Sequence, residues 1–165
     1  MTWNTDLAVR QAEPGDTHQI AALLTQLGYP STGDEVAERL SYWLPDPMSL
    51  ILVAEQGGRV LGCLSLHAIP YLERTGRWAR IESLVVDQSG RGRGTGRALV
   101  AAAEDAARNW DCLAVEVTSL RTRADAHAFY QRMGYADVCG SSGRFFKTLD
   151  PADVTSASSK WRVQP

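Results

Sequence analysis

Lysine is scarce in this chain of 165 residues, because Lys147 and Lys160 are the only lysines among 17 basic residues and the others are arginines. Nineteen acidic residues bring the net charge to −2. A chain with this balance has no broad basic field, so we expect neither nucleic acid nor an anionic membrane as a partner. No apolar run approaches the length that a membrane-spanning helix needs, and no signal peptide is expected at the start.

Cysteine is also rare. Cys63, Cys112 and Cys139 are odd in number, lie far apart and form no C-x-x-C pair. This pattern predicts reduced thiols in a cytoplasmic protein and excludes a disulfide framework or a cysteine zinc site, so no metal is expected.

Two common phosphate-binding motifs are missing from the glycine-rich stretch around residue 92. The P-loop requires a Gly-Lys pair, which occurs nowhere in the chain. The dinucleotide motif G-x-G-x-x-G fails in both registers, since the sixth position is Thr95 counted from Gly90 and Arg97 counted from Gly92. A nucleotide-binding protein is therefore disfavoured.

What the chain does have is a strand, a glycine-rich turn and a helix in direct succession over residues 81–99. Glycines allow backbone N–H groups to approach a ligand, and the first turn of a helix leaves its N–H donors unpaired. Together they predict an anion-binding cradle. A merely flexible turn is the alternative, but three glycines at 92, 94 and 96 would each cost about 0.5–1 kcal/mol in a regular element.

Hydrophobic periodicity and turn residues predict an α/β (α+β) chain with one domain over residues 1–150 and a tail over 151–165. Asp16 is expected to cap the first helix, and Gly57-Gly58 to turn the first hairpin. The helix over 95–109 crosses between two strands, which should therefore be parallel. Strands are predicted over 7–12, 49–55, 59–69, 77–86, 112–118, 135–139 and 144–149, and helices over 16–27, 34–44, 95–109 and 124–133.

Two motifs carry a resemblance to the GNAT superfamily of N-acetyltransferases. The first is Arg91-x-x-Gly94-x-Gly96 directly after a Leu-Val-Val strand, and the second is A-x-x-FY-x-x-x-G-Y ending at Tyr135. The predicted element order is also similar to that fold, a mixed sheet of about seven strands, mostly antiparallel with a central parallel pair, flanked by four helices. Within the superfamily, the motifs look like the branch of aminoalkylphosphonate and aminoglycoside 6′-type acetyltransferases.

The resemblance implies that acetyl-CoA is the co-substrate and, since relatives are often dimers, it makes a homodimer an expectation. It places the pyrophosphate on the glycine-rich loop and the pantetheine arm beside the strand that ends at Val86, where this strand diverges from its neighbour over 112–118. Many relatives carry Asn where Arg123 stands, so the contact of that residue is in doubt. The implied cofactor-binding residues are Leu84, Val85, Val86, Arg91, Gly92, Arg93, Gly94, Thr95, Gly96, Arg97, Arg123, His127 and Tyr130.

Acyl transfer to a primary amine requires a group that removes a proton from the ammonium form. Glu82 is our candidate, because a carboxylate in an apolar strand is unexpected unless it faces a cleft. In an unbroken strand Glu82 and Leu84 share a face. The alternative is an ion pair with Arg80.

Tyr130 occupies the position of the acid that protonates the leaving thiolate in many relatives, although it could instead be half of a core pair with Phe129. No cysteine has an activating neighbour, so direct attack in a ternary complex is predicted. The predicted function is acetylation of a small-molecule amine. A protein or peptide amine acetyltransferase and a non-catalytic acyl-CoA sensor remain alternatives, and the acceptor stays open because arginines (Arg74, Arg77, Arg80) and acids (Glu35, Glu38, Glu73) are both present.

Overall fold

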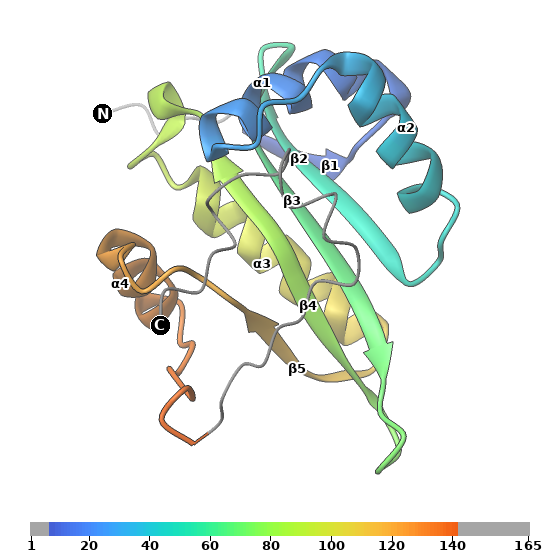
Figure 1. Ribbon diagram of the computed structural model, residues 1–165, viewed down its shortest axis with the longest axis vertical. Coiled ribbons are helices and arrows are strands. Elements are labelled where there is room, and N and C mark those ends of the chain that lie inside the picture. The colour runs from blue at the N-terminus through green and yellow to red at the C-terminus, as the bar shows by residue number, and fades with distance from the viewer. Residues whose placement is uncertain (1–6, 142–165) are drawn as a thin grey trace, which may run out of the picture. The chain divides into compact units, whose positions relative to one another are not determined.

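A computed structural model describes residues 7–141 of the chain. Its contacts divide the chain into two compact units, residues 1–123 and 124–165. Among the described residues, the first unit holds a five-stranded sheet, three α-helices and two short 3-10 helices (Pro14–Asp16 and Gln88–Gly90), and the second holds one α-helix (Figure 1). The strands are β1 (Ala8–Gln11), β2 (Ser49–Gln56), β3 (Arg59–Pro70), β4 (Arg77–Val86) and β5 (Cys112–Val117), and the helices are α1 (Thr17–Leu27), α2 (Gly33–Trp43), α3 (Thr95–Asn109) and α4 (Ala124–Arg132).

The sheet has the order β1-β2-β3-β4-β5, so each strand pairs with its neighbour in sequence. The first three pairings are antiparallel and β4 pairs with β5 in parallel. The parallel pair follows from the crossover through α3, as the sequence predicts. The β2–β3 turn is formed by Gly57 (φ 58°) and Gly58 (φ 78°), whose left-handed conformations suit a tight hairpin.

Two helical layers cover the two faces of the sheet. On one face, Cys63 and Val85 belong to a buried cluster with apolar residues of α1 and α2. On the other face, a Cβ added to Gly62 would lie 2.9 Å from a Leu99 methyl group of α3, so glycine allows this helix to approach closely. Figure 1 shows α3 passing behind β3 and β4.

The start of α1 differs from the prediction. Asp16 occupies the N-cap position, but its side chain makes no capping bond to this helix. Its carboxylate instead accepts hydrogen bonds from the backbone N–H of Glu13 (2.8 Å) and from both terminal nitrogens of Arg10 (2.8 and 2.9 Å). The guanidinium of Arg10 lowers the pKa of Asp16 despite the burial of this carboxyl group. Asp16 therefore joins the β1–α1 turn to the sheet.

The second unit contains α4, after which the chain turns at Gly134 in a left-handed conformation (φ 92°). The strand predicted over 135–139 is wrong, since these residues are not part of a strand in the structure. The strand predicted over 144–149 and the tail over 151–165 lie outside the described residues. The mixed α/β class and the four helices are confirmed, with five strands in the described part of the chain against about seven predicted.

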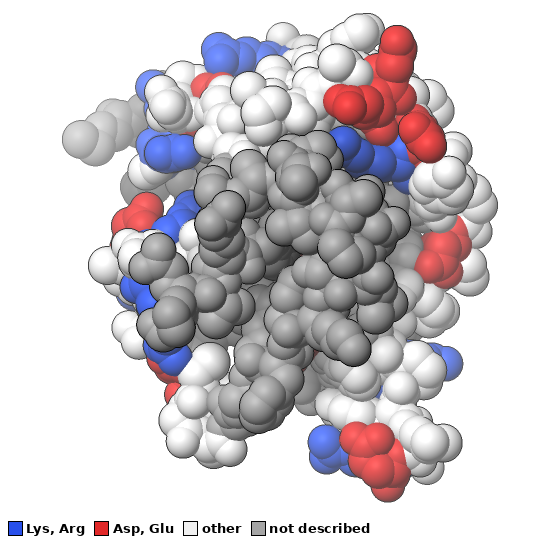
Figure 2. All heavy atoms as spheres, viewed as in Figure 1, with Lys and Arg blue, Asp and Glu red and all other residues white. Residues whose placement is uncertain are grey.

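Within residues 7–141, no helix is both long enough and apolar enough to span a membrane. Basic and acidic side chains both occur around the face shown in Figure 2. This mixture agrees with the net charge of −2.

Candidate active site

The glycine-rich loop enters α3 without a side-chain cap. Gly92 (φ 74°) and Gly94 (φ 86°) adopt left-handed conformations, and Gly94 stands at the N-cap position. Among residues 7–141, no heavy atom outside the adjoining residues lies within 4 Å of the position that a Cβ would take at either glycine, so toward this part of the chain their backbone is open. An uncapped helix start beside an open glycine backbone is suited to an anion.

Side chains of this loop divide into an exposed and a buried group. Arg91, Arg93 and Arg97 are exposed, and the Nε of Arg91 donates to the carbonyl oxygen of Val86 (3.2 Å). Thr95 is buried and its hydroxyl donates to the carbonyl oxygen of Gly90 (3.3 Å). The hydroxyl of Thr95 therefore stabilises the loop by bonding to Gly90. The backbone N–H of Thr95 is the group of this residue that a ligand could reach.

Asp87 fixes the point where β4 enters the loop, a role that the sequence analysis missed. Its carboxylate accepts from the Nε2 of Gln26 in α1 (2.8 Å), from Arg59 at the start of β3 (3.2 Å), and from the N–H (2.9 Å) and hydroxyl of Ser89. These donors, Gln26 first, lower the pKa of Asp87 from 3.8 to about 2. An Asp directly after a strand and two residues before Ser is a recognisable turn signal, but its partners in α1 and β3 are distant in sequence.

We expect Asp87→Asn to lower the free energy of unfolding by about 1–3 kcal/mol at neutral pH, because the charged acceptor of these hydrogen bonds is lost. The folded-state pKa of Asp87 lies below its ordinary value. Its contribution is therefore complete above about pH 4 and disappears as the pH falls towards 2. Urea unfolding at several pH values should show the difference in the free energy of unfolding between wild type and variant shrinking between about pH 4 and pH 2.

Asp105→Asn, at a carboxylate whose side chain is 74% exposed, is the control and should change the free energy of unfolding little. A difference between wild type and Asp87→Asn that is independent of pH would contradict this account.

The pairing of β4 with β5 stops before β4 ends. The last paired residues are Ile81 and Val117, whereas β4 continues to Val86 along β3. Within the described residues, positions 82–86 therefore have no strand partner on the β5 side. The pairing runs the whole length of β5, which ends at Val117, so residues 82–86 of β4 extend beyond it and offer backbone groups to an extended ligand. The divergence that the resemblance implied stays a prediction.

Glu82 lies at a β-bulge. The register of β3 with β4 passes from Ser65–Ser83 to Leu66–Ile81, so Glu82 is an extra residue in β4. The shared face of Glu82 and Leu84 was expected for an unbroken strand, and the bulge removes that condition. Leu84 pairs with Leu64, which alternates with Cys63 and so belongs to the face covered by α3.

Glu82 belongs instead to an open hollow on the α2 side of the sheet. The hollow has a volume of about 350 Å³ and is lined by Tyr42, Trp43, Asp46, Ser49, His67 and Glu82. The Glu82 carboxylate, whose side chain is 45% exposed, also forms an ion pair with the Nε of Arg80 (2.6 Å). Both interpretations of Glu82, a residue facing a cleft and a partner of Arg80, hold at once. Tyr42 and Trp43 of α2 line the same hollow.

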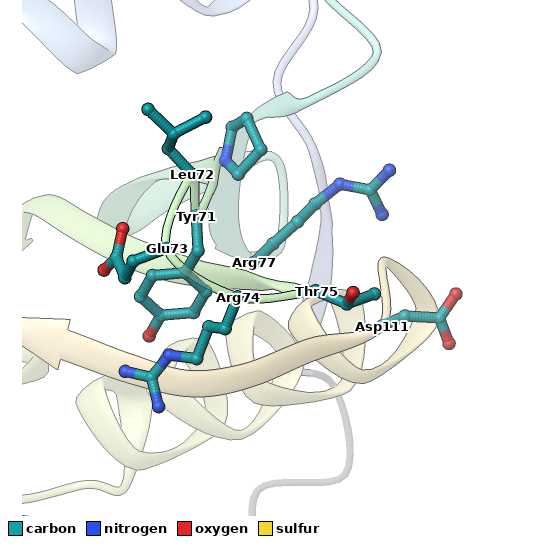
Figure 3. Close-up of a pocket in the computed structure, with 9 residues that line it drawn as sticks. Tyr71, Leu72, Glu73, Arg74, Thr75, Arg77 and Asp111 are labelled. Carbon is teal, nitrogen blue, oxygen red and sulfur yellow. The ribbon is translucent and has the colours of Figure 1, made fainter.

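A larger hollow of about 670 Å³ lies at the other end of β4 (Figure 3). It is lined by residues 70–77, the single loop between β3 and β4, together with Asp111. In it the guanidinium of Arg74 lies 4.3 Å from the ring centre of Tyr71. Because Arg77 begins β4 and Val86 ends it, about 30 Å of strand separates this loop from the glycine-rich loop. The smaller hollow is therefore the candidate acceptor site.

Arg123 ends the first unit and is exposed, and two of the predicted residues lie in the second unit. His127 and Tyr130 lie on α4 and are half-buried. The ring of Tyr130 packs edge-on against Phe129 (5.2 Å between centres) and against Tyr135 (5.7 Å). Phe129 and Tyr130 are thus paired, as the alternative has it, but both are half-buried, and no residue of α4 is fully buried. Contact of Arg123, His127 and Tyr130 with acetyl-CoA stays a prediction.

Comparison with known proteins adds to this geometry. Residues 17–135 match the model of the acetyltransferase (GNAT) family. Aminoalkylphosphonate N-acetyltransferase of Salmonella typhimurium is 34% identical over 146 residues, which cover 86% of this chain and 90% of that protein. A putative acetyltransferase from Agrobacterium tumefaciens has 28% identity and a TM-score of 0.75, with 87% of this chain and 99% of that one covered.

The same fold occurs in an aminoglycoside acetyltransferase from an uncultured soil metagenomic sample, solved in complex with sisomicin. Its TM-score is 0.76, and the match covers 90% of this chain and all of the other. With 18% identity, this likeness bears on the fold alone.

Proposed function

The chain belongs to the acetyltransferase (GNAT) family, and on that premise we propose that it transfers the acetyl group of acetyl-CoA to a primary amine of a small molecule. The observation that carries this proposal is the stretch of β4 after Ile81, which continues beyond the end of β5 directly before the uncapped glycine-rich loop. An extended arm beside the strand and a pyrophosphate at the helix start fit these two features.

The cofactor site consists mainly of backbone. Val85 is buried against the α1–α2 side, and Thr95 is buried in the loop, so their side chains are engaged inside the protein. The N–H groups over residues 91–97 and the backbone over 84–86 are the donors for pyrophosphate and pantetheine. One N–H of Leu84 or Val86 polarises the thioester carbonyl and stabilises the oxyanion. Arg91, Arg93 and Arg97 add positive charge at the loop surface.

The acceptor binds in the hollow that contains Glu82. Asp46 and Glu82 attract an ammonium group, and the aromatic rings of Tyr42 and Trp43 offer faces to a cation. The amine loses a proton at the Glu82 carboxylate and attacks the thioester carbon, and the thiolate leaves with a proton from Tyr130.

Direct attack is supported by the state of the cysteines. Cys63 is buried among apolar residues, which raises its pKa to about 12. The pKa of Cys112 is also raised by burial. Thiols that stay protonated are poor nucleophiles, so Cys63 and Cys112 are disfavoured as acyl carriers, which supports direct attack in a ternary complex.

Aminoalkylphosphonates are the first acceptors to test, because the curated relative is named for them. Their anionic group would need a cation, and Arg80 lies beside the hollow through its ion pair with Glu82. Arg74 and Arg77 line the larger hollow instead. The two carboxylates in the acceptor hollow equally suit a polycationic amine such as an aminoglycoside.

Release of CoA thiol from acetyl-CoA against a panel of amines tests the function. The panel contains aminoalkylphosphonates, aminoglycosides, polyamines, amino acids and short peptides. Turnover of a small amine is the expected result. Selective turnover of peptides would establish the alternative of a peptide acetyltransferase, and acetyl-CoA binding without any turnover would favour a sensor module.

A further inference from the structure

Three side chains of the acceptor hollow form a hydrogen-bonded chain. Ser49 opens β2 and His67 is its cross-strand partner in β3, while Asp46 lies in the turn that leads into β2. The Ser49 hydroxyl lies 2.6 Å from the Nδ1 of His67 and donates to the Oδ2 of Asp46 at 2.5 Å. The other carboxylate oxygen of Asp46 accepts from the N–H of Met48 (3.0 Å).

The hydrogen bonds determine which nitrogen of His67 carries the proton. An ionised carboxylate only accepts, so the single hydroxyl proton of Ser49 points at Asp46. The Ser49 oxygen then accepts from His67, which requires a proton on Nδ1 and leaves Nε2 as the acceptor of the neutral ring. Donation by Ser49 and Met48 lowers the pKa of Asp46, so this carboxylate keeps its charge at neutral pH.

The charged and titratable groups around His67 come from three elements. Arg80 is its cross-strand partner in β4 and is held by Glu82 and by Glu116 (both 2.6 Å). Glu82 of β4 and Tyr42 of α2 line the same hollow, and the ring of Trp43 packs edge-on against the imidazole of His67. The side chain of His67 is 40% exposed, so a small molecule in the hollow has access to it.

We propose that His67, oriented by Ser49 and Asp46, is a second catalytic residue of the acceptor site and accepts through Nε2 the proton that the ammonium loses at Glu82. This proposal rests on the function proposed above. A carboxyl group is in general several pKa units less basic than an amine, and an imidazole closes part of that difference. Ser49 and Asp46 are positioning residues, because they act through the ring.

The ammonium passes one proton through Glu82 to the Nε2 of His67, which yields a free amine and an imidazolium. The nitrogen lone pair forms the C–N bond, the C–S bond breaks, and the thiolate takes the second proton from the nitrogen by way of Tyr130. The imidazolium returns its proton to water, so one proton is released per acetyl group transferred.

The test compares an amine that must lose a proton with one that need not. Aminoethylphosphonate is a cation at its nitrogen at neutral pH, whereas its aminooxy counterpart has an uncharged nitrogen. We expect His67→Gln in the full chain to lower kcat/KM for aminoethylphosphonate about 50-fold. The loss should shrink as the pH rises towards the pKa of the amine. For the aminooxy compound the variant should fall less than threefold, a loss on the order of 0.6 kcal/mol.

Two further variants separate positioning from folding. Ser49→Ala should reproduce part of the loss with aminoethylphosphonate and also spare the aminooxy compound. His18→Gln, at an exposed histidine of α1, is the matched control and should behave as wild type. An equal loss with both acceptors in His67→Gln would overturn the proposal. No turnover of either acceptor by the wild type would instead contradict the proposed acceptor class.

Discussion

Replacing Glu82 with Gln is expected to lower kcat/KM for the amine acceptor about a thousandfold at neutral pH, a loss within the range for a general base. Glutamine keeps the size of the side chain but neither attracts an ammonium group nor accepts its proton. The affinity for acetyl-CoA should stay within about twofold of wild type, because the glycine-rich loop is untouched. Steady-state kinetics combined with titration calorimetry of acetyl-CoA measure both quantities.

Glu116→Gln is the matched control for this variant. Glu116 lies on β5 and accepts from Arg80 at 2.6 Å, the same distance as Glu82, but it does not line the acceptor hollow. This control removes an equivalent ion pair and should retain activity. Equal losses in the two variants would assign the effect to Arg80, and an unchanged rate in Glu82→Gln would exclude Glu82 from catalysis.

Replacing Gly94 with Val is expected to weaken acetyl-CoA binding about 100-fold, or roughly 2.8 kcal/mol. Gly94 has φ 86° at the N-cap of α3, a conformation that a β-branched residue adopts only under strain. A valine side chain would also cover the backbone that we expect the pyrophosphate to approach. Titration calorimetry of acetyl-CoA with the purified variant measures the change.

Gly58→Val tests whether strain alone explains such a loss. Gly58 has φ 78° in the β2–β3 hairpin, and the position of its missing Cβ is as open as that of Gly94. The hairpin variant should lose a comparable amount of folding stability and bind acetyl-CoA normally. If both variants bind acetyl-CoA as wild type does, the glycine-rich loop is not the pyrophosphate site.

Local features of the fold were predictable from the sequence because each depends on a few adjacent residues. Gly57-Gly58 specifies its hairpin through positive φ angles, and Gly28 (φ 101°) ends α1 in the same way. The helix after the glycine-rich loop begins at Thr95 and ends at Asn109, as its apolar spacing predicts. The parallel β4–β5 pair followed from the crossover rule.

Features that depend on distant partners were not predictable. Asp16 looked like a helix cap, but Arg10 in β1 captures its carboxylate. The bulge at Glu82 arises from the register with β3, which the periodicity of β4 alone does not reveal. The strand expected over 135–139 rested on local propensity, and these residues do not pair within the described chain.

The candidate site also combines residues that the sequence reveals with contacts that only the fold reveals. The glycine-rich loop and Glu82 were identified from motif and composition, whereas the bonds among Asp46, Ser49 and His67 join a turn to two strands. Single-residue signals at these three positions are weak, since each residue type is common at a protein surface. Only the fold brings them to Glu82.

The most direct test of the central claim is to incubate the protein with acetyl-CoA and aminoethylphosphonate and to follow CoA thiol and product mass together. The account predicts one N-acetylated amine for each CoA released, with release dependent on the amine. CoA release without an acetylated amine, or no release with any amine of the panel, would contradict it.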